Sequence, residues 1–119
     1  MSQIDSFKQL IVWQKAMELA KEVYSATEKL PKHETYGISS QAQRSAVSIA
    51  SNIAEGHKRS TRKDYAQFLR IALGSSAELE TQLLLISEIY KTVNLKKCLD
   101  IVVEIQKILT TIIKKLSDV

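Results

Sequence analysis

The sequence predicts an all-α protein, an antiparallel up-down-up-down four-helix bundle in which residues 1–119 form one domain. Three observations predict this class. Apolar residues recur at three- and four-residue spacing through most of the chain, which is typical of amphipathic helices. One proline and three glycines leave little material for the turns that many short strands would need. The connections between the periodic segments are short, which favours antiparallel packing of consecutive helices.

The first helix is predicted over residues 6–30. Pro31 should end it, because proline disfavours helical geometry in the preceding residue and has no backbone N–H to donate. Apolar residues spaced three and four apart define the face expected to point into the core. That face comprises Phe7, Leu10, Trp13, Met17, Ala20, Tyr24, Thr27 and Leu30.

The second helix is predicted over residues 39–55 and is rich in small side chains. Ser39 or Ser40 is expected to cap it. Gly56 should take the left-handed position that commonly follows a helix. The small residues should let a neighbouring helix approach closely. The inward stripe comprises Ala42, Ala46, Ile49 and Ile53, with Ala50 and Ala54 beside it.

The third helix, predicted over residues 61–91, has the most regular pattern of the four. Thr61 and Asp64 resemble a capping box at its start. Gly74 lies inside the helix and is expected to mark a close contact with a neighbouring helix. The predicted core positions are Tyr65, Leu69, Ala72, Ser76, Leu79, Leu83, Ile86 and Tyr90.

The fourth helix is predicted over residues 94–116, with Asn94 as its cap, and its apolar arc is too wide for one face. One stripe comprises Leu95, Leu99, Val102, Leu109, Ile113 and Leu116. The second stripe comprises Cys98, Ile101, Ile105, Ile108 and Ile112. Since one stripe can face the bundle core, the second is expected to form an oligomer interface with another copy of the chain.

Composition narrows the classes of partner and the compartment. The net charge of +4 and the pI near 9.2 permit nucleic acid or an acidic protein as partner. No apolar run approaches the ~20 residues that span a bilayer, and the N-terminus lacks the apolar segment of a signal peptide. Cys98 is the single cysteine, so no internal disulfide can form. A cytoplasmic protein with no membrane partner is expected.

The densest positive charge follows the second helix. Lysine and arginine on a turn suit phosphate binding, and the amide groups that open the next helix add positive potential. The candidate nucleic-acid-binding residues are Lys58, Arg59, Arg62 and Lys63, with Arg44 and Arg70 as lesser candidates. The alternative is a solvated turn whose side chains cap helices and pair with Glu55.

No catalytic or metal-binding constellation is found. His33 and His57 are the only histidines, neither follows a glutamate at the spacing of di-iron bundles, and Cys98 does not complete a zinc site. No glycine-rich phosphate loop is present. We therefore expect no enzyme activity, metal or cofactor.

Four polar residues remain ambiguous. They are interpreted either as solvated side chains or as a structural polar network between helices. Enzyme activity would require a deep pocket that holds Asn52, Glu55 and Glu78 together. The residues are Asn52, Glu55, Glu78 and Glu80.

Several segments together resemble a known family. They are Val12-Trp-Gln-Lys-Ala16, Leu30-Pro-Lys-x-Glu34-x-Tyr36-Gly37, Gln41-x-x-Arg44, Ser48-Ile-x-x-Asn52-Ile-Ala-Glu-Gly56 and Phe68-Leu-x-Ile-Ala-x-Gly-Ser75-x-x-Glu78-Leu-Glu80. These segments resemble the four-helix-bundle family of 23S rRNA intervening-sequence proteins, from about Phe7 to Leu116. The most specific part is Asn52-Ile-Ala-Glu-Gly56 followed by the basic turn.

The resemblance implies a biological setting and an assembly. Family members are encoded in insertions within bacterial large-subunit rRNA genes or elsewhere in bacterial genomes, and the family has no established biochemical activity. The accessory variability protein of diversity-generating retroelements looks like a relative; it is a positively charged pentameric barrel that binds nucleic acid and a reverse transcriptase. A homopentameric ring of this chain would multiply its net charge of +4 fivefold.

The sequence thus predicts a cytoplasmic, non-enzymatic, homo-oligomeric ring of bundles. It would bind structured RNA or DNA through phosphates at the basic turn. The alternative is a protein-interaction scaffold for a partner enzyme such as a reverse transcriptase.

Overall fold

The computed structural model describes residues 6–117, and the regular structure within that range is entirely helical. The four main helices are α1 (Ile11–Thr27), α2 (Ile38–His57), α3 (Arg62–Ile89) and α4 (Lys96–Ser117). Two short 3-10 helices, η1 (Phe7–Gln9) and η2 (Lys32–Glu34), precede α1 and α2. The predicted all-α class and the four helices are confirmed.

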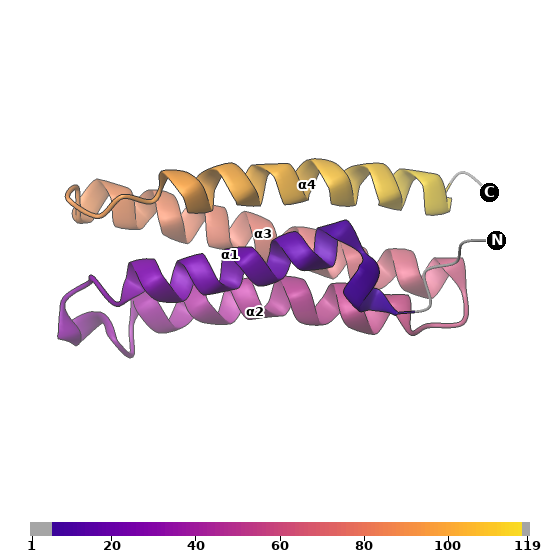
Figure 1. Ribbon diagram of the computed structural model, residues 1–119, viewed down its shortest axis with the longest axis horizontal. Helices are drawn as coiled ribbons and strands as arrows, with labels where there is room; N and C mark the ends of the chain where they lie inside the picture. The colour runs from indigo at the N-terminus through magenta and orange to yellow at the C-terminus, as the bar shows by residue number, and fades with distance from the viewer. Residues whose placement is uncertain (1–5, 118–119) are drawn as a thin grey trace.

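The four helices form a rod of 48 × 22 × 22 Å (Figure 1). α1 and α3 each pack against both α2 and α4. The α1–α2 and α3–α4 connections lie at one end of the rod, and the α2–α3 connection lies at the other (Figure 1). The start of α1 and the end of α4 are also at this second end. The basic turn is therefore beside the last turn of α4.

The core runs along the whole rod and contains side chains from all four helices. The predicted inward stripes of α2 and α3 are confirmed over most of their length, with only Tyr65 and Tyr90 half-buried at the ends of the α3 stripe. Each fully buried Leu or Ile stabilises the fold by roughly 1.5–3 kcal/mol relative to exposure. The largest fully buried side chains are Leu19, Ile49, Ile53, Leu69, Leu79, Leu83, Ile86, Ile105 and Leu109.

Most of the predicted core face of α1 is displaced by one residue, which is about 100° of rotation around a helix. Thr27 and Leu30, the last two predicted positions, are buried as predicted. The buried residues of α1 are Val12, Ala16, Leu19, Val23, Ala26 and Thr27. Met17 and Tyr24 are instead 36% and 47% exposed, and Trp13 is half-buried. Small and branched side chains therefore occupy the tight helix contact, and the larger ones flank it. The helix also begins later than predicted, because Leu10 has an extended backbone.

The two helical glycines have the opposite roles from those predicted. Gly56 lies inside α2 with negative φ, so it is not a left-handed residue after the helix. A Cβ added there would lie 2.8 Å from Cβ of Phe68 on α3, so this glycine marks the close helix contact. A Cβ added at Gly74 would have no neighbouring atom within 4 Å, so the predicted close contact there is wrong.

Two of the three predicted helix caps agree with the structure. The Thr61 side chain accepts a hydrogen bond of 3.1 Å from the Asp64 amide, as predicted. Asn94 accepts one of 3.0 Å from the Lys96 amide at the start of α4. The predicted cap of α2 is wrong, because α2 begins at Ile38 without a side-chain cap and Ser39 is buried within its first turn.

The second apolar stripe of α4 does not lie outside the bundle as predicted. Cys98, Ile101 and Ile105 are buried within the single chain, while Ile108 and Ile112 are half-buried. α4 contacts both α1 and α3, so its wide apolar arc is covered from two sides. The prediction that a single chain leaves this stripe uncovered is therefore wrong at Cys98, Ile101 and Ile105.

Candidate nucleic-acid interface

The α2–α3 turn is held in place by contacts on both sides. His57 at the end of α2 packs edge-on against Tyr65 of α3, with ring centroids 5.9 Å apart. Burial raises the pKa of the Tyr65 hydroxyl, in keeping with this packed position. Thr61 then caps α3. The basic residues of the turn are therefore presented by an ordered connection.

Arg59 is committed to contacts within the chain. Its guanidinium donates to the Glu55 carboxylate at 2.8 Å and lies over the Phe68 ring, 4.6 Å from the centroid. The pairing with Glu55 is one that the sequence offered as the alternative for this turn. An exposed ion pair of this kind stabilises by only about 0–1 kcal/mol, but it offsets the charge that a ligand would meet.

Arg62 and Arg70 connect α3 to the last turn of α4. Arg62 donates to the Lys115 carbonyl at 2.9 Å, and Arg70 donates to the Ser117 hydroxyl at 3.1 Å. The last carbonyls of a helix have no partner within it and carry partial negative charge. Arg62 therefore satisfies one of these carbonyls and fixes the end of α4 against α3.

A cavity of about 270 Å³ opens between α3 and the end of α4. Three of the predicted phosphate-binding residues line it, together with Ala66, Leu116 and Ser117; the three are Arg62, Lys63 and Arg70. The first amides of α3 lie at the same place, and a helix N-terminus favours anions. The geometry combines cationic side chains with an electropositive helix end.

Two lysines of this surface have no ion pair within residues 6–117. Lys58 and Lys63 are exposed, and neither has a carboxylate within 4.0 Å in that range. Lys114 and Lys115 add positive charge in the last turn of α4. At the opposite end, Lys96 and Lys97 pair with acidic side chains, whereas the exposed Lys29, Lys32 and Lys91 have no ion pair within residues 6–117. We call Lys58, Lys63, Lys114 and Lys115, with Arg59, Arg62 and Arg70, the basic end.

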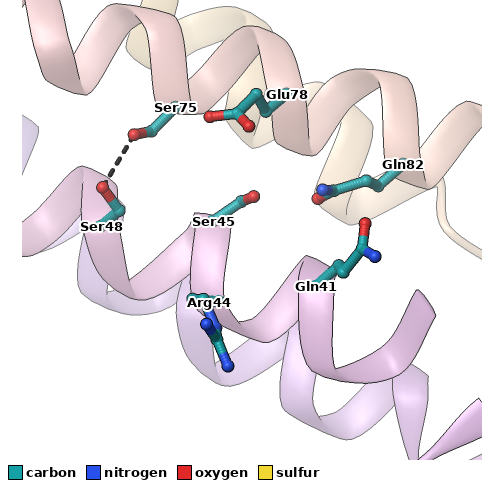
Figure 2. Close-up of a pocket in the computed structure, with 7 residues that line it drawn as sticks. All are labelled: Gln41, Arg44, Ser45, Ser48, Ser75, Glu78 and Gln82. Carbon is teal, nitrogen blue, oxygen red and sulfur yellow. Dashed lines mark hydrogen bonds between the residues drawn. The ribbon is translucent and has the colours of Figure 1, made fainter. Parts of the chain in front are cut away.

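Arg44 does not belong to the basic end. It lies near the middle of α2, about 20 Å along the helix axis from Lys58. There it lines a polar groove between α2 and α3 (Figure 2). The structure therefore brings five of the six predicted residues to one end of the bundle and leaves Arg44 at a separate site.

The four ambiguous polar residues do not form one network. Asn52 donates to Ser48, whose hydroxyl is 2.8 Å from that of Ser75 on α3. Glu80 accepts from Gln106 of α4 at 3.0 Å, while Glu55 pairs with Arg59. The contact between Ser48 and Ser75 was not predicted from the sequence. Serines at matching positions on two adjacent helices could have indicated it.

Two further findings concern the described part of the chain. It contains no group of three or more His, Cys, Asp or Glu side chains placed to hold a metal ion. Among its helices, none combines the length and the apolar character needed to cross a bilayer.

Fold and surface together define a small four-helix bundle with a cationic end. The chain belongs to the family of 23S rRNA-intervening sequence proteins, whose family model matches residues 8–112. The resemblance drawn from the sequence is thereby confirmed.

A solved structure supports the same relationship. It is a protein of unknown function from the S23 ribosomal protein family of Bacteroides thetaiotaomicron, 28% identical to this chain with a TM-score of 0.77. The match covers 87% of this chain and 99% of that one. No curated protein matches the chain.

Proposed function

We propose that the protein is a non-enzymatic, cytoplasmic, homo-oligomeric bundle that binds structured RNA or DNA through phosphate contacts at the basic end. The observation that carries the proposal is the juxtaposition of Lys63, Arg62 and Arg70 around one cavity beside the start of α3. Nucleic-acid affinity arises mainly from such neutralisation of phosphates.

The four basic residues of the α2–α3 connection and the start of α3 divide into two groups. Arg59 and Arg62 are engaged with Glu55 and with the α4 carbonyl, so they hold the surface in shape. Lys58 and Lys63 are exposed and unengaged within residues 6–117, so they are the ones expected to meet phosphate first. This division refines the sequence-based proposal, in which Lys58, Arg59, Arg62 and Lys63 together carried most of the binding.

The proposed mode of binding reads phosphates rather than bases. Proteins that bind single-stranded nucleic acid without sequence preference stack the bases on exposed aromatic rings. The aromatic rings nearest the turn, Tyr65 and Phe68, are half-buried and face His57 and Arg59. This surface therefore supports contact with the phosphate backbone of the nucleic acid and not with its bases.

Fluorescence anisotropy with a labelled RNA hairpin and a labelled DNA duplex tests the proposal. The variant Lys58→Gln/Lys63→Gln should bind each probe about tenfold more weakly, because two phosphate contacts are lost. Lys91→Gln/Lys107→Gln removes the same charge from exposed positions elsewhere and should change affinity little. Equal losses in the two variants, or no binding by the native protein, would reject the basic end as the site.

A second candidate, a protein-interaction scaffold, is favoured by a different surface. A groove of about 370 Å³ between α1 and α2 is lined almost wholly by apolar atoms. We call it the apolar groove; its lining residues are Trp13, Met17, Ala20, Val47, Ala50, Ser51 and Ala54. Its concave apolar lining suits an apolar side chain of a partner protein.

The same groove is where we now place the contact between copies. The homo-oligomeric ring, proposed as a pentamer, needs apolar surface that one chain leaves uncovered. Met17 and Val47 supply such surface, being 36% and 44% exposed, whereas much of the α4 stripe is buried. A partner enzyme such as a reverse transcriptase would compete for this groove under the scaffold alternative.

A further inference from the structure

The polar groove between α2 and α3 is a second cavity, distinct from the basic end. Its volume is about 330 Å³, near the lower limit of small-molecule sites. The lining residues come from one side of each helix and are drawn in Figure 2. They are Gln41, Arg44, Ser45, Ser48, Ser75, Glu78 and Gln82.

The register of the two helices arranges these residues as three successive rungs. Ser48 and Ser75 close one end of the groove through their 2.8 Å hydroxyl contact. Because α2 and α3 run in opposite directions, Arg44 precedes Ser48 by about one turn and Glu78 follows Ser75 by about one turn. Gln41 and Gln82 form the third rung, and Ser45 lies on α2 next to Arg44 (Figure 2).

Opposite charges line this groove without pairing. No carboxylate lies within 4.0 Å of Arg44, and no basic group lies within 4.0 Å of Glu78, anywhere in residues 6–117. Both residues are exposed. A positively charged and a negatively charged side chain that line one groove without pairing can each bind an oppositely charged group of the same ligand.

The groove also contains an unsatisfied acceptor. Gln82 Oε1 is the one side-chain polar atom in the described range that is buried without a hydrogen-bond partner. Leaving a buried acceptor unpaired costs about 1–3 kcal/mol, so a rotation of the Gln82 amide that presents this oxygen to a donor in the groove would be stabilising. The neighbouring Glu78 carboxylate accepts hydrogen bonds as well. The inner part of the groove is therefore matched to an N–H donor group.

We propose that this groove binds a small zwitterion of the α-amino-acid class. The ammonium group donates to Glu78 and to Gln82 Oε1. The Arg44 side chain, which extends away from α3 in Figure 2, swings across the rim to pair its guanidinium with the carboxylate. Guanidinium and carboxylate form two parallel hydrogen bonds, which gives this end of the ligand its orientation. The ligand's own side chain occupies the remaining space along the groove.

This inference does not depend on nucleic-acid binding. The groove is about 20 Å along α2 from Lys58, and only Arg44 was ever a candidate for both sites. Loss of one activity by mutation should leave the other intact. Variants at the groove can therefore be scored on both properties.

Saturation-transfer NMR with each of the twenty common L-amino acids, tested one at a time at millimolar concentration, is the direct experiment. At least one should bind, and its N-acetyl and carboxamide derivatives should each bind about tenfold more weakly, because each lacks one charge. In a ¹H–¹⁵N spectrum of the protein, the Gln82 side-chain amide should shift on addition of the ligand.

Glu78→Gln and Arg44→Gln should each weaken binding about tenfold. Their matched controls, Glu88→Gln and Lys91→Gln, remove the same charges from exposed positions outside the groove and should leave affinity unchanged. The inference is overturned if no amino acid binds, if both derivatives bind as well as the free ligand, or if binding survives both groove substitutions.

Discussion

Gly56 of α2 lies against the side chain of Phe68 of α3, so close that a Cβ at position 56 would be 2.8 Å from the Phe68 Cβ. The same Phe68 ring lies under the Arg59 guanidinium. The contact therefore does two things: it lets α2 and α3 approach closely, and it supports the first residues of the basic turn. A hydrogen atom is the only side chain that this spacing admits without movement.

The two helical glycines give a matched pair of stability predictions. Gly56→Ala should lower the free energy of unfolding by about 1–3 kcal/mol, because an added methyl group forces the helices apart. Gly74→Ala should raise it by about 0.5–1 kcal/mol, because alanine favours the helix and no atom is close enough to clash. Urea denaturation followed by circular dichroism measures both. Equal effects of the two substitutions would contradict the packing described for Gly56.

Glu55 should act as a brake on nucleic-acid binding at the basic end. Glu55→Gln removes the carboxylate that holds Arg59 at 2.8 Å and so frees one positive charge. Affinity for the RNA hairpin should rise about threefold, since an exposed ion pair of this kind is worth less than about 1 kcal/mol. Anisotropy titration measures the change, with Glu88→Gln as the control. Weaker binding of Glu55→Gln would show that the pair orients Arg59 for its ligand.

Cys98 should be an unreactive thiol in the native protein. Burial, with a smaller contribution from the Glu22 carboxylate, raises its pKa from 9.0 to about 11. Because the thiolate is the nucleophile, a disulfide reagent at pH 8 should react slowly with the native chain and quickly in urea. Fast reaction with the native chain would contradict the burial of this residue.

The same shift makes a prediction about stability at high pH. An unfolded Cys98 loses its proton above about pH 9 and a native one above about pH 11, so the unfolded state holds fewer protons between these values. The free energy of unfolding should therefore fall as pH rises through this window. Cys98→Ala should show a smaller fall over the same window, measured by urea denaturation at each pH.

The apolar groove predicts how assembly can be disrupted. If copies meet there, Val47→Glu should yield single chains at micromolar concentration, because a charge would be buried in the contact. Ile89→Glu, at an apolar position 58% exposed near the end of α3, is the control and should leave the assembly intact. Light scattering gives the molar mass of each. A native protein that is already a single chain would reject the ring.

Much of the fold could be predicted from periodicity, because the residues of α2 and α3 that recur at three- and four-residue spacing are the ones buried in the core. The prediction misplaces most of the α1 face because it assigns the largest residues of the helix, Trp13 and Tyr24, to the core. The structure places Ala16 and Leu19 there instead. The wide apolar arc of α4 correctly indicated that this helix has a second packing partner besides α3. That partner is α1 of the same chain and not another copy.

The candidate site was only partly predictable for a related reason. The density of lysine and arginine in the sequence located the basic turn. The order of the four helices placed this turn at the same end of the bundle as the end of α4. The contacts of Arg62 with the Lys115 carbonyl and of Arg59 with Phe68 depend on how helices distant in sequence pack. The sequence therefore indicated where charge collects. The structure distinguishes Lys58 and Lys63, which have no ion pair within residues 6–117, from the arginines that are engaged.

The salt dependence of binding tests the central claim most directly. For a DNA duplex, the slope of log K against log salt concentration counts phosphate contacts at about 0.9 for each. Replacing Lys58 and Lys63 with glutamine should make that slope shallower by about 1.8, while the Lys91→Gln/Lys107→Gln control keeps the native slope. A slope unchanged by loss of both lysines would contradict phosphate binding at the basic end.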